Sequence, residues 1–273
     1  MQRIANPPLV GSIPTLASNL IQENYRFMIS NFYSYPQKHN RSFARRIGKS
    51  LSQSQRSKID DVISDLFKFA NIEEPEDFDI SLLYQQEELI SAIVSKLSLM
   101  DNLNLEIGLG MGEHFFAQIS ANPDKFFIGS EPYLNGVASL KNRCDNAGLD
   151  NYIIWPDDIN LLLNAFESYP IFHQIYVLFP DPWHKKRHHR KRILNEERIS
   201  RFYDLLKDDA ALNFATDIED YADSVIEIID RSEFDIYNKD ISEPHEGYIQ
   251  TKYHSKALEE GRVPAFYSFI KRK

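Results

Sequence analysis

The sequence predicts an α/β domain built on a mostly parallel sheet with helices on both faces. Five short apolar runs lead to this prediction, because continuous hydrophobic stretches are typical of strands that are buried on both faces. The first four runs recur about every 25 residues, the length of one strand with its crossover helix. The runs are Leu103–Ile107, Phe126–Gly129, Tyr152–Trp155, Ile175–Phe179 and Ala211–Ala215.

Other segments extend this plan on both sides. Residues 50–70 and 85–97 have apolar side chains at helical spacings of three and four, and we expect a helix in each. Phe234–Tyr237 and Ala265–Ile270 are two further candidate strands. Residues 1–35 contain prolines and many polar residues, which is typical of a loosely docked arm. We therefore divide the chain into an arm (1–35), a basic segment with N-terminal helices (36–100) and a sheet domain (101–273).

The overall charge of -9 disfavours a polyanionic partner, but its distribution does not. Residues 36–59 contain Lys and Arg without any acid, and residues 184–192 are again purely basic. Such stretches can bind a nucleic acid locally on an acidic protein. A single cysteine, Cys144, excludes an internal disulfide and a multi-cysteine metal cluster. No apolar run approaches the roughly 20 residues of a membrane helix, so we expect a cytoplasmic protein without a membrane partner.

Acidic residues lie at or just beyond the ends of four predicted strands. They are Glu106, Glu131, Asp158 and Asp181. Ligands of open parallel sheets bind outside the carboxyl ends of the strands, so these four acids define one candidate site. Each of them alone could be a solvated loop carboxylate, and only their joint placement indicates a site.

A glycine-rich loop follows the first strand. Gly108, Gly110 and Gly112 allow a sharp turn and a close approach of a ligand to the backbone. Their G-x-G-x-G spacing differs from the dinucleotide fingerprint G-x-G-x-x-G. A carboxylate after the second strand, Glu131, can accept ribose hydroxyls, and Glu106 suits a cationic amino-acid group better than a pyrophosphate. The loop therefore favours S-adenosylmethionine over NAD, although it could also be an ordinary tight turn.

The fourth run ends in Phe179-Pro180-Asp181-Pro182-Trp183. Prolines fix their own φ and restrict the residues before them, so we expect a stiff, extended platform that holds one carboxylate and one large ring. Rigid support of this kind is what a reactive group requires. The alternative is a proline-rich turn with a solvated aspartate.

The basic run from His184 to Arg192 follows this turn directly and contains six Lys or Arg and three His. A run without acids next to a candidate site indicates contact with a phosphate backbone, although solvated charge runs are common. His184, His188 and His189 lack a neighbouring carboxylate or cysteine set, so we expect no metal site.

These motifs together resemble the bacterial tRNA (guanine-N7)-methyltransferases over residues 41–273. The resemblance rests on Glu106–Gly112, Phe127–Glu131, Phe179–Arg192 and Ala215–Asp217, with Arg41–Gly48 as a similar N-terminal basic segment. It implies a Rossmann-like class I methyltransferase fold, S-adenosylmethionine as cofactor and N7 of guanine 46 in the tRNA variable loop as target. It places the cofactor on Glu106, Glu131, Asp158 and Asp181, beside the glycine loop, with Asp181 also as the catalytic residue.

The resemblance also implies contacts with the substrate. They fall on Lys185, Arg187, Arg190, Lys191, Arg192, Asp217, Thr251 and Lys252. His254 stands where the family's Thr-Lys-Phe-Glu motif has a glutamate, which removes an acceptor. Asp217 has a second interpretation, because Thr216 and Glu219 have the spacing of a capping box at a helix start.

The function we expect is therefore S-adenosylmethionine-dependent methylation of tRNA at guanine N7 by a monomer or homodimer without an obligate protein partner. Three alternatives remain at this point: an amino-group nucleic-acid methyltransferase, a NAD-dependent dehydrogenase, and a non-catalytic RNA-binding protein on the same fold. Nucleoside mapping of the product distinguishes the first from N7 methylation.

Overall fold

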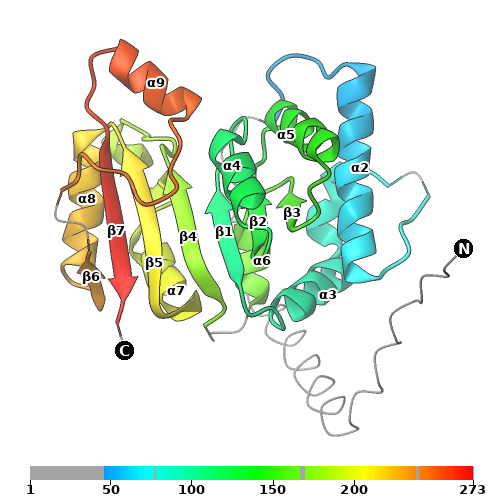
Figure 1. Ribbon diagram of the computed structural model, residues 1–273, viewed down its shortest axis with the longest axis horizontal. Coiled ribbons are helices and arrows are strands. Elements are labelled where there is room, and N and C mark those ends of the chain that lie inside the picture. Colours follow the sequence, from blue (N-terminus) through cyan, green and yellow to red (C-terminus); the bar gives the residue numbers. More distant parts are fainter. Residues whose placement is uncertain (1–45, 77, 167–169, 238–239, 273) are drawn as a thin grey trace, which may run out of the picture. The chain divides into compact units, whose positions relative to one another are not determined.

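A computed structural model describes residues 46–272 of this chain, apart from residues 77, 167–169 and 238–239 (Figure 1). The expected arm of residues 1–35 and the basic stretch from Arg41 to Arg45 lie outside the described residues. The described residues belong to one compact unit. The boundary that we predicted at residue 100 stays a prediction.

Seven strands form one sheet in the order β3-β2-β1-β4-β5-β7-β6. The strands are β1 Leu103–Ile107, β2 Phe126–Ser130, β3 Tyr152–Trp155, β4 Phe172–Leu178, β5 Leu206–Thr216, β6 Phe234–Ile236 and β7 Ala265–Lys271. β1 to β5 pair in parallel, and β7 is antiparallel to both β5 and β6. The predicted α/β class with a mostly parallel sheet is confirmed.

Two strands begin earlier than their apolar runs indicated. β4 starts at Phe172 and β5 at Leu206, and each includes polar residues before its apolar part. The register between them shifts at Phe172/Gln174, and Asp209 has a φ of 60°. Polar residues at the margin of a sheet reach solvent, so the hydrophobic pattern shows only the buried part of these strands.

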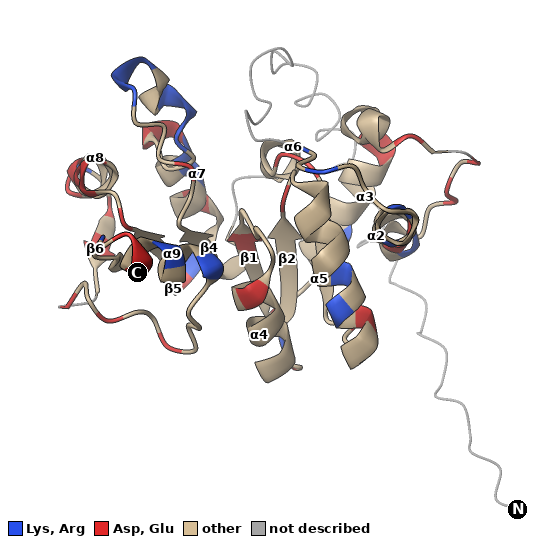
Figure 2. Ribbon diagram, turned by 90° about the horizontal axis from the view of Figure 1, so that it is seen from above, with Lys and Arg blue, Asp and Glu red and all other residues tan. Residues whose placement is uncertain are grey.

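Helices cover both faces of the sheet. They are α2 Gln53–Ala70, α3 Glu87–Leu97, α4 Glu113–Ala121, α5 Leu134–Ala147, α6 Asn160–Ala165, α7 Glu196–Leu205, α8 Glu219–Ile229 and α9 Lys252–Glu259, with the 3-10 helices η1 Ile80–Gln85 and η2 Lys186–Lys191. Apolar side chains of α2, α4 and α5 form one buried cluster with β2 and β3. Seen from above, α4 lies on one side of the sheet and α6 and α7 lie on the other (Figure 2).

Helix α2 has strong local signals and is fastened to the sheet domain. Ser52 and Gln55 form a capping box at its start, with Ser52 Oγ accepting from the Gln55 N–H at 3.2 Å. Lys58 donates to Asp145 of α5 at 2.8 Å. The predicted helices at 50–70 and 85–97 are confirmed as α2 and α3.

The strand order reverses direction between β1 and β4. The chain runs from β1 outward to β3 and then returns to β4 on the other side of β1. Connections therefore leave β1 and β4 in opposite directions, and ligands of open parallel sheets bind outside the carboxyl ends of the strands at such a point. The glycine loop and the Phe179–Trp183 turn follow these two strands. Within the described part of the chain, no helix has the length and apolar character needed to cross a membrane.

Candidate active site

The three glycines after β1 all adopt the left-handed backbone conformation that favours glycine. Their φ values are 80° at Gly108, 56° at Gly110 and 73° at Gly112, and Gly112 is the N-cap residue of α4. A Cβ built on Gly108 would meet no atom within 4 Å. The loop thus turns sharply and leaves open space at Gly108, where a ligand can approach the backbone.

Glu131 lies directly after β2 and holds this loop in place. One carboxylate oxygen accepts from the Gly110 N–H at 2.6 Å and the other from the Tyr133 N–H at 2.7 Å. The residue is 7% exposed. Burial raises the pKa of Glu131 to about 7, and the negative charge of Asp181 acts in the same direction. Each carboxylate oxygen has a further lone pair, so the group can still accept a hydroxyl.

Helix α5 approaches the glycine loop so closely that only glycine fits at position 136. A Cβ on Gly136 would lie 1.9 Å from the carbonyl oxygen of Gly110. The sequence motifs did not single out this residue. The available signal was Asn135-Gly136 in the first turn of a helix, where glycine is otherwise unfavourable. Gly136 therefore sets the height of the loop above the sheet.

Glu106 is buried within β1, where it pairs in register with Gly129 and Tyr176. Its Oε2 lies 2.7 Å from Nδ1 of His114 on α4. Nε2 of His114 in turn lies 3.0 Å from Nε2 of His245. Burial lowers the pKa of His245 to about 3, and His114 contributes to this shift. The sequence reasoning missed both histidines, and the role of Glu106 toward a cofactor stays a prediction.

Asp158, after β3, is buried and organises the start of α6. Its Oδ1 accepts from the backbone N–H and the side-chain amide of Asn160 at 2.9 and 2.8 Å. Oδ2 of the preceding residue, Asp157, accepts from Nη1 of Arg46 at 2.8 Å. An arginine of the basic N-terminal segment thus pairs with an acid at the end of β3. The predicted cofactor contact of Asp158 stays a prediction.

The turn after β4 begins with a residue that is left-handed, not extended as we expected. Phe179 and Trp183, which flank Pro-Asp-Pro, have φ values of 50° and 46°. Such left-handed non-glycine residues cost on the order of 1–3 kcal/mol each and persist only where the surroundings impose them. The N–H of Phe179 donates to the Ala215 carbonyl of β5 at 2.8 Å, and Lys191 Nζ lies 4.5 Å from the centre of the Trp183 ring. The platform is therefore strained and held from outside.

Asp181 is the exposed tip of this turn. Its carboxylate makes no hydrogen bond or ion pair with any residue that the structure describes. Surrounding protein atoms raise the pKa of Asp181 by desolvation although its side chain remains accessible. Its charge also raises the pKa of Glu131, because the two carboxylates lie near enough to interact. That they belong to one cofactor site stays a prediction.

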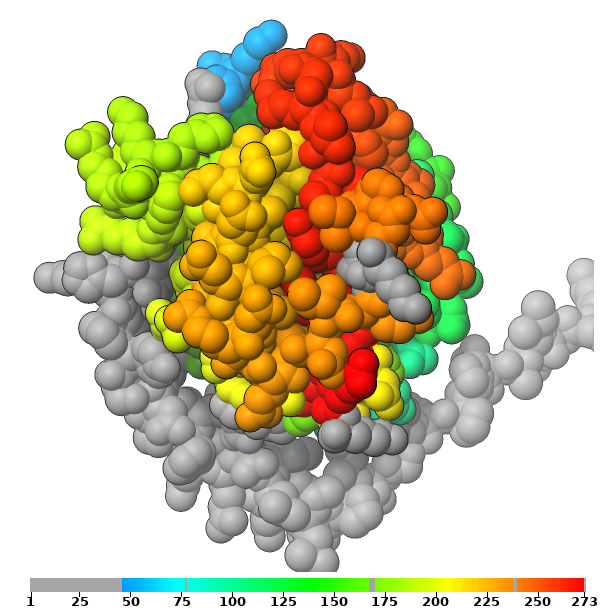
Figure 3. Space-filling view, turned by 90° about the vertical axis from the view of Figure 1, so that its left-hand side faces the viewer, coloured from blue at the N-terminus to red at the C-terminus, as the bar shows by residue number. Residues whose placement is uncertain are grey.

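Most of the basic run forms the 3-10 helix η2, whose cations project from the surface. Lys185, Lys186, Arg187 and Arg190 are exposed. Figures 2 and 3 show this segment standing away from the sheet, beside α7 and α8. Arg192, at the end of η2, is different, because it is 2% exposed. The prediction that Arg192 contacts tRNA is wrong for this arrangement, since a buried guanidinium cannot reach a phosphate.

The predicted substrate contacts at the C-terminal end of β5 and the start of α9 also have local partners. Asp217 Oδ2 accepts from Nε of Arg262 at 2.5 Å. The alternative interpretation of this segment as a capping box is wrong, because α8 has Ile218 as N-cap and no side-chain cap hydrogen bond. Thr251 is buried as the N-cap of α9 and accepts from the His254 N–H at 3.2 Å. Lys252 is exposed.

Helix α9 brings two aromatic side chains to the site. The ring of Tyr253 lies above the glycine loop, so that a Cβ on Gly110 would come within 3.1 Å of it. His254 stacks on Phe179 with ring centres 5.8 Å apart, and its Nδ1 lies 2.9 Å from the hydroxyl of Tyr248. The histidine that replaces the family's glutamate is thus an aromatic support for the strained turn.

The sheet order and the site after β1, β2 and β4 define a class I methyltransferase, a class that takes its methyl group from S-adenosylmethionine. The described residues fit this cofactor, because the space above Gly108 is open and Glu131 can accept hydroxyls beside it. A family model described as "Putative methyltransferase" matches residues 101–265.

Known relatives narrow this class to a family. The chain is 34% identical over 242 residues to a tRNA (guanine-N(7)-)-methyltransferase of Ruegeria pomeroyi, covering 86% of this chain and 96% of the relative. It is 40% identical over 229 residues to a bifunctional methyltransferase of Rickettsia conorii, covering 83% of this chain and 39% of that protein. The chain therefore belongs to the bacterial tRNA (guanine-N7)-methyltransferase family.

The bifunctional relatives are much longer than the region they share with this chain, which spans 39% of the Rickettsia conorii protein and 45% of the Rickettsia typhi protein. Among solved structures, the 16S rRNA methyltransferase KamB is similar with a TM-score of 0.49 and 13% identity, covering 74% of this chain and 97% of that one.

Proposed function

We propose that this protein transfers a methyl group from S-adenosylmethionine to N7 of guanine 46 in the variable loop of tRNA. One observation supports this proposal most directly. Asp181 presents an accessible carboxylate on a strained turn between the glycine loop and an exposed basic helix. Family membership supplies the reaction class, and this carboxylate supplies a group that can act on the guanine.

The cofactor would be held at the carboxyl ends of β1 and β2. Gly108 and Gly110 would let it approach the backbone, and Glu131 would accept the ribose hydroxyls. The predicted cofactor set also includes Gly112, Glu106 and Asp158. Gly112 is the N-cap residue of α4, and the two acids are buried. Bound S-adenosylmethionine supplies an activated methyl group on a sulfonium centre.

The chemistry requires alignment rather than proton removal. Guanine N7 carries a lone pair and no proton, so the N7–methyl bond forms as the sulfur–methyl bond breaks and no general base is needed. The guanine becomes cationic, and its Watson–Crick edge becomes a stronger hydrogen-bond donor. An acceptor at that edge stabilises the transition state more than the ground state. Asp181 is our candidate for this acceptor, because its carboxylate is exposed and bonds no residue that the structure describes.

Exposed cations of η2 would position the tRNA. Lys185, Arg187 and Arg190 face solvent next to the turn, and they can neutralise phosphates without reading the sequence. Lys191 would contribute through its place over Trp183. Asp217, Thr251 and Lys252 are the remaining proposed substrate contacts; they lie after β5 and at the start of α9.

The assay combines purified protein, labelled S-adenosylmethionine and unmodified tRNA, followed by digestion to nucleosides. We expect 7-methylguanosine, and its absence would reject the proposal. A product methylated on an exocyclic amino group would establish the amino-group alternative instead. Absence of any transfer in the presence of tight tRNA binding would indicate the non-catalytic RNA-binding alternative. Sequence mapping of the product tests position 46.

Asp181→Asn tests the role of the carboxylate. An amide can accept only weakly and brings a competing donor, so we expect kcat to fall roughly 100-fold, as for loss of one preorganised electrostatic partner. The dissociation constants of S-adenosylmethionine and tRNA should change far less. Asp230→Asn is the matched control, because Asp230 is exposed at the end of α8, away from the site. Near-normal turnover of Asp181→Asn would exclude this role.

We further propose that the chain acts in the cytoplasm, as a monomer or homodimer that needs no other protein. In this proposal α2 and α3 support the catalytic domain. Both helices belong to the basic segment with N-terminal helices, residues 36–100. Size-exclusion chromatography with light scattering, with and without tRNA, tests the oligomeric state.

A further inference from the structure

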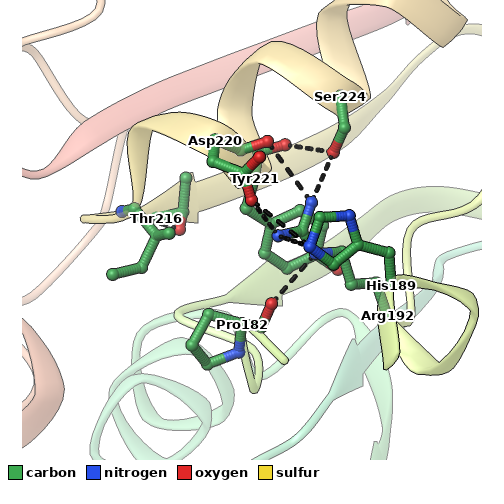
Figure 4. A network of polar contacts seen from close by, with 8 residues as sticks. Pro182, His189, Arg192, Thr216, Asp220, Tyr221 and Ser224 are labelled. Atoms are coloured by element: carbon green, nitrogen blue, oxygen red, sulfur yellow. Dashed lines mark hydrogen bonds and ion pairs between the residues drawn. The ribbon is translucent and has the colours of Figure 1, made fainter. Parts of the chain in front are cut away.

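We propose that Arg192 is a positioning residue, which holds the Pro182 carbonyl and thereby the turn that presents Asp181. This inference deepens the proposed function and rests on it. Figure 4 shows the guanidinium between the Pro182 carbonyl on one side and α8 on the other. The sequence alone had grouped Arg192 with the tRNA-binding cations.

Every donor of the Arg192 guanidinium has a partner inside the protein. Nε donates to the Pro182 carbonyl at 2.9 Å. Nη1 donates to Ser224 Oγ at 2.9 Å and to the Asp220 carbonyl at 3.3 Å. Nη2 donates to the Asp220 carboxylate and contacts Nε2 of His189 at 3.2 Å. All three nitrogens of the guanidinium thus have partners within the protein, and the residue is 2% exposed, so the group does not face a phosphate.

The surroundings of this group suit a permanently held cation. The guanidinium carbon lies 4.6 Å from the centre of the Tyr221 ring, which provides a cation–π contact. The pKa of Asp220 is lowered, mainly by its hydrogen bond to Arg192. Buried charges are tolerated when they are paired and fully hydrogen-bonded, and Arg192 fulfils both conditions.

The bond to Pro182 has a particular target. Trp183, the next residue, is one of the two left-handed residues that flank Pro-Asp-Pro. The first of them, Phe179, is tied to β5 through its N–H. Arg192 provides the corresponding tie at the other end of the turn. Strained residues persist only when their surroundings impose the conformation. The hydrogen bond from Arg192 to the Pro182 carbonyl therefore determines the position of Asp181.

The same residue also joins the turn to the basic helix. The N–H of Arg192 donates to the His189 carbonyl at 2.9 Å, which ends η2. One arginine thus connects η2, the catalytic turn and α8. Loss of its geometry should displace Asp181 without removing a charge that tRNA contacts.

Arg192→Lys is the decisive variant, because it keeps the charge and removes the planar fork. We expect kcat at saturating tRNA to fall about tenfold to a hundredfold, the range for a displacement near 1 Å at a reacting centre. The slope of log Kd for tRNA against log salt should stay at the wild-type value. Arg231→Lys is the matched control, since Arg231 lies just after α8 but is exposed, and among the described residues its side chain donates to the Glu227 carbonyl of its own helix. It should retain wild-type kcat.

A second readout does not depend on activity. The protein has two tryptophans, Trp155 in the core and Trp183 in the turn. After labelling with 5-fluorotryptophan, the ¹⁹F spectrum should show two resonances, which Trp183→Phe assigns. We expect Arg192→Lys to move or broaden the Trp183 resonance and to leave that of Trp155 in place. Arg190→Ala should lower the salt slope and leave both resonances unchanged.

Two milder variants keep the inference testable if Arg192→Lys does not fold. Ser224→Ala and Asp220→Asn each remove one anchor of the guanidinium on α8, and we expect both to move the Trp183 resonance and to lower kcat. An unmoved Trp183 resonance in all folded variants would overturn the inference, as would a reduced salt slope with normal kcat in Arg192→Lys. If the wild-type protein methylates no tRNA, the proposed function fails, while the ¹⁹F spectra still decide whether Arg192 holds the turn.

Discussion

Gly136→Ala is the change whose effect follows most directly from the geometry. The added Cβ would lie 1.9 Å from the Gly110 carbonyl oxygen, whereas real contacts of this kind do not fall below 3.0 Å. Helix α5 and the glycine loop must therefore separate by about 1.1 Å, the difference between these two distances. The backbone fixes the position of the Cβ and its partner is a backbone carbonyl, so no side-chain rotation can relieve the collision.

The effect on stability and the effect on binding differ in size. Alanine in place of glycine within a helix contributes about 1 kcal/mol, and overpacking costs about 1–3 kcal/mol. Stability should therefore fall by at most about 2 kcal/mol, or roughly 4–8 °C in Tm. The loop displacement also disrupts the 2.6 Å bond from Gly110 to Glu131. We expect the Kd for S-adenosylmethionine to rise at least about tenfold, because misplacement near 1 Å can cost roughly 100-fold.

Isothermal titration with S-adenosylmethionine and thermal unfolding measure the two effects separately. Gly148→Ala is the control, because Gly148 has a φ of 66° but a Cβ there would meet nothing within 4 Å. That variant should lose about 1 kcal/mol of stability and keep the wild-type affinity for the cofactor. Wild-type affinity of Gly136→Ala for S-adenosylmethionine would refute the argument that Gly136 determines the position of the glycine loop.

Three further predictions concern charge. Burial raises the pKa of Glu131 to about 7 from its ordinary 4.5, so the folded state binds more protons than the unfolded state between these pH values. The free energy of unfolding therefore falls by at most roughly 3 kcal/mol as pH rises through this window. Glu131→Gln should reduce the change in Tm between pH 5 and 8, and an equal change in the variant and the wild type would contradict this prediction. Burial lowers the pKa of His245 to about 3 from 6.5, so the free energy of unfolding falls as pH falls below 6.5, by roughly 2 kcal/mol at pH 5. Chemical unfolding at pH 7 and pH 5 should show a smaller loss in His245→Gln than in the wild type. Joint replacement of Arg187 and Arg190 by alanine should weaken tRNA binding and reduce the slope of log Kd against log salt by about 2. Filter binding at several salt concentrations measures this slope. A wild-type slope in the variant would show that these residues face solvent and do not contact tRNA.

The sequence by itself determined the mostly parallel sheet and indicated where the candidate site lies. β1 and β3 have the bounds that their apolar runs predicted, because a strand buried on both faces is mostly apolar. The acids and glycines after these strands could be placed together, since the carboxyl ends of parallel strands meet at one edge. The glycine loop and the Asp181 turn were therefore found by local patterns alone.

Tertiary structure decided what each polar side chain contacts. Arg192 belongs to an unbroken basic run, yet it is buried against α8, 28 residues further along the chain, while Arg190 is exposed. His114 and His245 meet across 131 residues, and Gly136 is required by a loop on another strand. Periodicity and motif spacing describe a residue's own segment. A hydrogen bond or a collision between distant segments depends on how helices pack on the sheet, so the partners of Arg192, Glu106 and Gly136 became visible only in three dimensions.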